Sequence, residues 1–80
     1  MSAVPIARLV HELEELKELM DAGKLRHGEY DQRLARTITE LRERKIDADR
    51  ATIGKTLTEL LAKGTITPSV KDHIEKRLGL

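Results

Sequence analysis

Residues 16–25 read LKELMDAGKL, and residues 57–66 repeat this stretch with small changes as LTELLAKGTI. Each copy starts as a leucine-rich helix and then reaches a glycine, Gly23 or Gly64. Glycine is the residue that most often ends a helix, because it adopts the left-handed backbone conformation without strain. The repeat therefore predicts two helices that each stop at a glycine before the chain turns back.

A second apolar series follows each copy in steps of four residues. The first series is Tyr30, Leu34 and Ile38, and the second is Val70, Ile74 and Leu78. The two copies are offset by 41 residues before the glycine (16 to 57) and by 40 after it (30 to 70), so the second loop is one residue shorter. Each copy therefore predicts a helical hairpin with an apolar seam that has to be buried.

The periodicity and the capping residues predict an all-α fold with four helices, at about residues 5–22, 27–45, 48–63 and 68–78. Pro5 is suited to the first turn of a helix, which leaves residues 1–4 as a loose end. Asp47 or Asp49 is expected to cap the third helix, and Thr67 followed by Pro68 is expected to begin the fourth. The break at residues 46–49 is too short to separate two domains. The two hairpins, about 5–45 and 48–78, should therefore share one core in a single domain, residues 1–80.

The composition fits a small helical domain without covalent cross-links. The 80 residues include no cysteine, which excludes disulfides and thiolate metal sites, and Tyr30 is the only aromatic residue. Charged residues make up 36% of the chain, yet the net charge is only +1, so both signs are mixed over the surface. A core this small gains stability by association, so a homodimer or higher oligomer is expected. No apolar run is long enough to span a bilayer, which favours a cytoplasmic protein without a membrane partner.

None of the reactive side chains forms a recognisable catalytic or metal-binding motif. His11 and Glu15 are one helical turn apart, but two ligands make a poor metal site. The run GKT at residues 54–56 imitates the end of a phosphate-binding loop, but Asp49 stands where that loop needs a glycine. We therefore predict a protein that is not an enzyme and has no catalytic residue, metal, cofactor or small-molecule substrate.

The most favoured function is a small protein–protein interaction module that associates with itself, with another protein or with both. The first helix extends beyond the repeated part, since the second copy has little that corresponds to it before Ile53. This extension predicts an apolar stripe left over for a partner. Together with the single aromatic residue, the predicted partner-binding residues are Ile6, Leu9, Val10, Leu13 and Tyr30.

Two other functions remain open from the sequence. A nucleic-acid-binding transcriptional regulator would use Arg33, Arg36 and Arg44, which fall near one side of the second helix, although acidic residues are interleaved with them. A small inhibitor of a host enzyme is the third hypothesis. Binding to duplex DNA that weakens steeply with salt would favour the regulator over an interaction module.

The first copy resembles a known family of short helical domains. Residues 16–25, followed by Glu29, Tyr30 and Leu34, are similar to the short C-terminal domain called SHOCT, in which a leucine-rich helix, a glycine, an acidic–aromatic pair and a second helix follow one another. Residues 57–78 resemble a degenerate second copy, with Val70 in place of the aromatic residue. The resemblance implies a prokaryotic or phage regulator or adaptor, and a helical hairpin that mediates association. It brings no catalytic residues.

Overall fold

Four helices and two very short strands make up residues 3–80, which are the residues that the computed structural model describes. The helices are α1 (Ile6–Asp21), α2 (Glu29–Arg44), α3 (Arg50–Ala62) and α4 (Pro68–Leu78), and the strands are β1 (Val4–Pro5) and β2 (Ile46–Asp47). The prediction of an all-α arrangement of four helices is confirmed. Each predicted helix boundary lies within two residues of the observed one.

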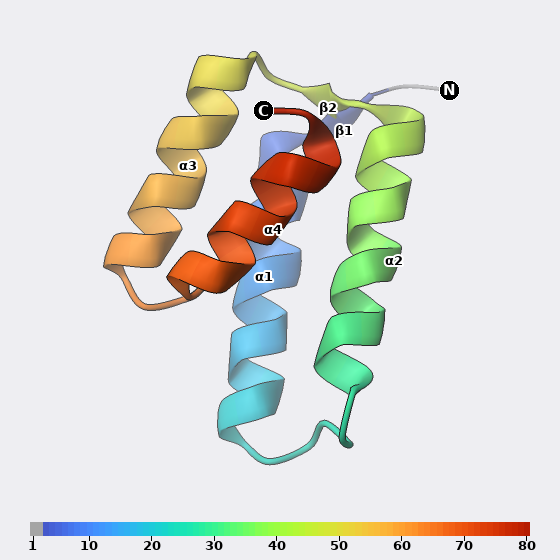
Figure 1. Ribbon diagram of the computed structural model, residues 1–80, viewed down its shortest axis with the longest axis vertical. Coiled ribbons are helices and arrows are strands. Elements are labelled where there is room, and N and C mark those ends of the chain that lie inside the picture. Colours follow the sequence, from blue (N-terminus) through green and yellow to red (C-terminus); the bar gives the residue numbers. More distant parts are fainter. Residues whose placement is uncertain (1–2) are drawn as a thin grey trace.

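The two hairpins pack against each other (Figure 1). In this view α1 lies at the back and α4 at the front, with α3 and α2 on the two sides. Helix α1 packs against α2 and α3, and α4 also packs against α2 and α3. Buried residues of both hairpins belong to one hydrophobic cluster.

The core is built only from aliphatic side chains. Leucine and isoleucine residues of all four helices meet at its centre, as the seams predict. The buried members are Val4, Leu9, Leu13, Leu16, Leu34, Ile38, Leu41, Ile53, Leu57, Leu60, Ile66 and Ile74. Residues at the ends of the seams are less buried, and Met20 has 46% of its surface exposed because it lies on the last turn of α1.

The two repeated glycines end their helices with the same hydrogen bonds. Gly23 has φ +69° and Gly64 has φ +80°. The amide of Lys24 donates to the carbonyl of Leu19 (3.0 Å), and at the equivalent position the amide of Thr65 donates to the carbonyl of Leu60 (2.9 Å). Each glycine amide also donates to the carbonyl three residues before it, at 3.1 Å in both copies. This pair of bonds is the Schellman motif. The sequence repeat is therefore also a repeat of backbone geometry.

The N-terminal segment is part of the fold, which corrects the expectation of a loose end at residues 1–4. Val4 is fully buried in the core, and its amide donates to the carbonyl of Lys45 at 2.8 Å. Val4 and Pro5 pair in parallel with Ile46 and Asp47. A two-residue strand has no periodicity, and its partner is far away in the sequence, so the seams gave no signal for it. The part of the expectation that concerns residues 1 and 2 lies outside the described residues.

Candidate functional site

The predicted partner stripe on α1 is mostly used by the chain's own core. Leu9 and Leu13 are 1% and 0% exposed, so a partner cannot contact them in the folded chain. Ile6 and Val10 are half-buried and pack against the same core. The expectation of an unoccupied stripe was therefore wrong for Leu9 and Leu13. The physical reason is that α1 packs against β1, α2 and α3, so that its apolar side is covered within the chain.

Tyr30 lies at the edge of the core, in the first turn of α2. The side chain is half-buried and packs against the core cluster. Burial raises the pKa of the Tyr30 phenol above its ordinary value of 10.0, and the nearby carboxylate of Asp31 raises it further, while Lys17 lowers it. Its role as an interface anchor stays a prediction.

The predicted basic ridge on α2 is interleaved with acids. The guanidinium of Arg33 lies 3.7 Å from the carboxylate of Glu29, and that of Arg44 lies 3.5 Å from Glu40. Arg8 of α1 approaches the same Glu40 carboxylate at 2.9 Å, which joins α1 to α2. Arg36 has no ion-pair partner within residues 3–80. Two of the three predicted nucleic-acid contacts are therefore already paired with acids, which weakens the attraction of this side of α2 for phosphates.

An apolar pocket of about 280 Å³ lies at the end of the bundle where α2 and α4 finish. Its walls come from the last turn of α2, the linker to α3, the first part of α3 and the C-terminal residues. The lining residues are Leu41, Arg42, Lys45, Ile46, Ile53, Leu78 and Leu80. We call this site the linker pocket. The segments that line it, namely the end of α2, β2, the start of α3 and the C-terminal end, lie near the top of Figure 1.

Local backbone geometry brings these residues together. Lys45 ends α2 with φ +64° and ψ 149°, which redirects the chain into β2 and places Ile46 at the pocket. Asp49 then begins α3 by accepting a hydrogen bond from the amide of Thr52 at 2.7 Å, so that Ile53 faces the core and the pocket. Asp47, the other residue predicted as a cap, belongs to β2 instead. The capping of α3 by Asp49 is thus the predicted option that the structure confirms.

The C-terminal end completes the pocket. Gly79 has φ +75° and turns the chain after α4, and the amide of Leu80 donates to the carbonyl of Glu75 at 2.8 Å. This bond holds Leu80 against the pocket, where 36% of its surface stays exposed. Among the described residues, Leu80 and Met20 are the large apolar residues that are exposed, and they belong to different ends of the bundle.

The charged side chains in the lining of the linker pocket are both positive. Arg42 and Lys45 are the charged residues in its lining, both are exposed, and neither has an ion-pair partner anywhere in residues 3–80. An apolar floor with cations at its rim can hold an aliphatic or aromatic side chain and attract a carboxylate beside it.

A second depression, of about 460 Å³, lies between α2 and α4 and contains Asp31, Ser69 and His73. These residue types are those of a nucleophile, a base and an orienting acid. No hydrogen bond or ion pair joins the three side chains in the described part of the chain, and catalysis of that kind needs such contacts. The described residues also contain no cluster of three or more histidine, aspartate or glutamate side chains that could hold a metal ion.

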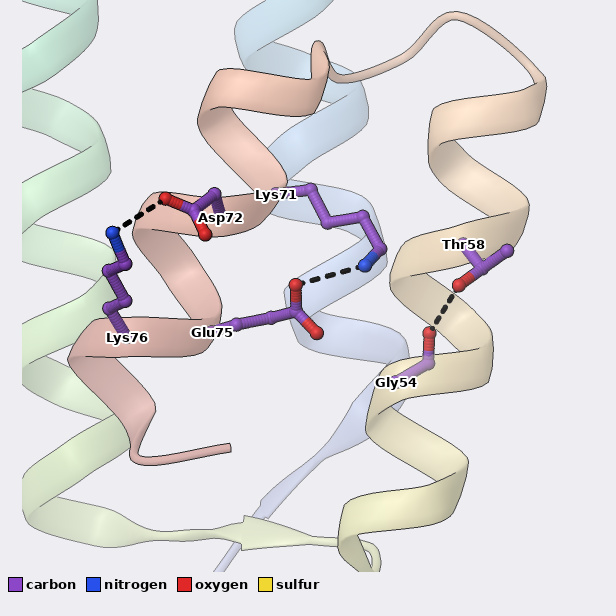
Figure 2. Close-up of polar contacts among 6 residues, drawn as sticks. All are labelled: Gly54, Thr58, Lys71, Asp72, Glu75 and Lys76. Atoms are coloured by element: carbon purple, nitrogen blue, oxygen red, sulfur yellow. Dashed lines mark hydrogen bonds and ion pairs between the residues drawn. The ribbon is translucent and has the colours of Figure 1, made fainter.

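On the side of α4 that points toward α3, the charged side chains pair with each other (Figure 2). Lys71 and Glu75 lie on that side and pair at 2.9 Å, while Asp72 and Lys76 pair at 3.0 Å on the other side of the helix. On the neighbouring helix α3, the hydroxyl of Thr58 donates to the carbonyl of Gly54. The charged groups here already have partners, in contrast to those of the linker pocket.

Sequence reasoning missed the linker pocket because its residues belong to four separate segments. Ile46 lies in the predicted break between the hairpins, and Leu80 lies beyond the predicted end of the fourth helix at residue 78. The available signal was that both are apolar residues outside any seam, which have to pack somewhere or stay exposed. Arg42 and Lys45 gave no signal, since surface cations are common.

None of the helices in residues 3–80 is long and apolar enough to cross a membrane. Comparison with protein-family models, curated proteins and solved structures gave no match. The resemblance to the SHOCT domain therefore stays a prediction.

Proposed function

We propose that this chain is a small protein–protein interaction module that docks an apolar side chain of a partner protein in the linker pocket. Its two hairpins form the rigid frame, and the partner contributes the side chain that fills the pocket. The function is binding, without a chemical step.

The observation that carries this proposal is an open pocket with an aliphatic floor, at whose mouth Leu80 stays partly exposed. Burying aliphatic surface releases about 25 cal/mol per Å², so an apolar partner gains affinity there. The pocket volume of about 280 Å³ is at or below the lower end for sites that enclose a whole small molecule, which favours one side chain of a larger partner.

Self-association was expected from the sequence, but it now needs a surface other than the buried stripe. Two linker pockets facing each other would bring four cations together, and like charges across an interface disfavour binding. The partner that we propose is therefore a different surface, either on another protein or on another part of a second copy.

The proposal can be tested by nuclear magnetic resonance with the ¹⁵N-labelled full chain and a pair of short uncharged peptides. One peptide carries a central leucine, and the other carries an alanine in the same place. We expect the leucine peptide to shift the amide signals of Ile46, Ile53 and Leu78, and the alanine peptide to shift them much less.

Two matched variants localise the effect. Leu80→Asp places a charge at the mouth of the linker pocket and should weaken the leucine peptide, whereas Met20→Asp makes the same change at the opposite end and should not. Shifts that instead cluster at Ile6 and Val10, or a Leu80→Asp variant that binds as well as the original chain, would show that the pocket is not the docking site. Light-scattering mass across concentrations reports separately on self-association.

A further inference from the structure

We infer that the partner segment that docks in the linker pocket is acidic, with carboxylates on both sides of its apolar side chain, and that Arg42 and Lys45 select it. This inference rests on the proposed function and adds the chemistry of the partner. Two observations support it: the positive side chains in the lining of the pocket, and the strained backbone conformation of Lys45.

The charge of α2 differs between its two sides. On the side that faces α1, Arg33 and Arg44 lie next to Glu29 and Glu40. On the side of the linker pocket, neither Arg42 nor Lys45 has an acidic partner within the described chain. Unpaired cations at the rim of an apolar pocket favour a partner that brings carboxylates, because complementary charges speed the encounter and fix the orientation.

The backbone of Lys45 indicates that its side chain is kept for a purpose. Within residues 3–80, Gly23, Gly28, Gly64 and Gly79 have positive φ, and Lys45 is the one residue other than glycine that does. A non-glycine residue with φ +64° and ψ 149° is strained, and glycine at this position would relieve the strain. The carbonyl of Lys45 that receives the amide of Val4 would be present in glycine as well. What glycine cannot supply is a positively charged side chain at a residue that lines the pocket.

The apolar lining of the linker pocket favours an acidic protein segment over other kinds of anionic partner. A nucleic acid would neutralise Arg42 and Lys45, but it would leave the five aliphatic residues of the lining uncovered. An acidic segment with one aliphatic or aromatic side chain matches both features. The acid-rich second half of α1 in another copy of the chain is one source of carboxylates, and concentration-dependent mass would reveal it.

The test uses the ¹⁵N-labelled full chain at low salt and short peptides that differ only in the residues flanking a central leucine. The flanks are aspartate in one peptide, asparagine in the second and lysine in the third. We expect the aspartate peptide to bind roughly tenfold more tightly than the asparagine peptide, which corresponds to two exposed ion pairs. The lysine peptide should bind most weakly, and the advantage of aspartate should shrink as salt screens the charges.

Variants at the rim give the decisive comparison. Lys45→Gly should melt at the same or a higher temperature than the original chain, yet its preference for aspartate should fall from about tenfold to about threefold because one of the two ion pairs is lost, whereas Lys45→Arg should keep the full preference. The double variant Arg33→Gln with Arg36→Gln removes two charges from the other side of α2 and should leave the preference unchanged. Lys45→Gln keeps the side-chain length and gives the same comparison if the glycine variant does not fold.

The possible failures are distinct. If the asparagine peptide binds as tightly as the aspartate peptide, or if Lys45→Gly and Lys45→Gln keep the full preference, the acidic partner is wrong and the docking function stands. If no leucine peptide shifts the amides of the linker pocket, both the inference and the proposed function are wrong.

Discussion

The two hairpins end their first helices in the same way but begin their helices differently. Both α1 and α3 stop at a left-handed glycine with the same pair of hydrogen bonds. In the second hairpin, Asp49 and Thr67 cap α3 and α4 with side-chain oxygens. In the first hairpin, α1 follows Pro5 and α2 follows Gly28, and neither has a side-chain cap.

Helix length gives a physical reason for this difference. The helices of the first hairpin have 16 residues each, whereas those of the second have 13 and 11. A short helix has few internal hydrogen bonds to offset the cost of its first turn, so it depends more on caps. The comparison teaches that the repeat encodes the stop and the seam, while the starts are adjusted to the length of each helix.

The largest expected effect on stability comes from the equivalent core leucines of the two hairpins, Leu16 and Leu57. Both are buried, and truncation of a buried leucine to alanine removes apolar contacts and leaves a cavity. We expect Leu16→Ala and Leu57→Ala each to lower the free energy of unfolding by about 2–5 kcal/mol, measured by urea denaturation. A cost well below this range in only one copy would show that the two seams do not contribute alike.

The next test concerns the two glycine stops. Alanine in the left-handed conformation costs about 1–2 kcal/mol, so Gly23→Ala and Gly64→Ala should destabilise the protein by similar amounts. Gly54→Ala is the control, because Gly54 is helical and a Cβ there meets no atom within 4 Å. That control should stabilise the chain by about 0.5–1 kcal/mol. Clearly different losses of stability in the two variants would show that the turns at Gly23 and Gly64 are not equivalent.

A smaller effect is expected at the cap of α4. The hydroxyl of Thr67 accepts a hydrogen bond from the amide of Val70 at 3.2 Å. Thr67→Ala leaves that amide without this partner and should cost about 1 kcal/mol in urea denaturation. Thr58→Ala removes a hydroxyl that bonds only within α3 (Figure 2), and its cost should be smaller because alanine favours the helix. Equal effects at the two positions would argue against a special role for the cap.

The smallest expected effect is a pH dependence of stability at the Asp49 cap, which the uncharged Thr67 cap does not share. The hydrogen bonds from Thr52 lower the pKa of the Asp49 carboxyl below its ordinary value of 3.8. The folded state therefore binds fewer protons than the unfolded state, so the contribution of Asp49 is present above pH 3.8 and is lost as the pH falls through the lower folded value. Urea denaturation at decreasing pH should show the original chain losing stability relative to Asp49→Asn, which does not titrate. Parallel pH curves for the two proteins would contradict this role of the charge.

The sequence predicts the helices, the seams and the stops because these features are local and periodic. Leu34, Ile38, Leu57 and Leu60 are buried as their spacing requires, and the cap at Thr67 needs only three neighbouring residues to be recognised. The contacts that sequence reasoning missed join distant segments without a period.

The pairing of Val4 with Ile46 and the linker pocket are of this second kind. The pocket depends on how α4 lies against α2 and on the turn at Gly79, which no local pattern specifies. The same reason explains the wrong expectation for Leu9 and Leu13. Their spacing correctly predicts an apolar side of α1, but the sequence of one helix does not show which other segments of the chain cover that side.

The position of Tyr30 determines how unfolding of this protein can be observed. It is the only aromatic residue, and it packs at the edge of the core beside the turn of the first hairpin. Near-ultraviolet absorbance and intrinsic fluorescence therefore report on the surroundings of this one residue, whereas far-ultraviolet circular dichroism averages all four helices. Coincident melting curves from the two signals would show that the hairpins unfold as one cooperative unit, and an earlier optical transition would show that the uncapped hairpin opens first.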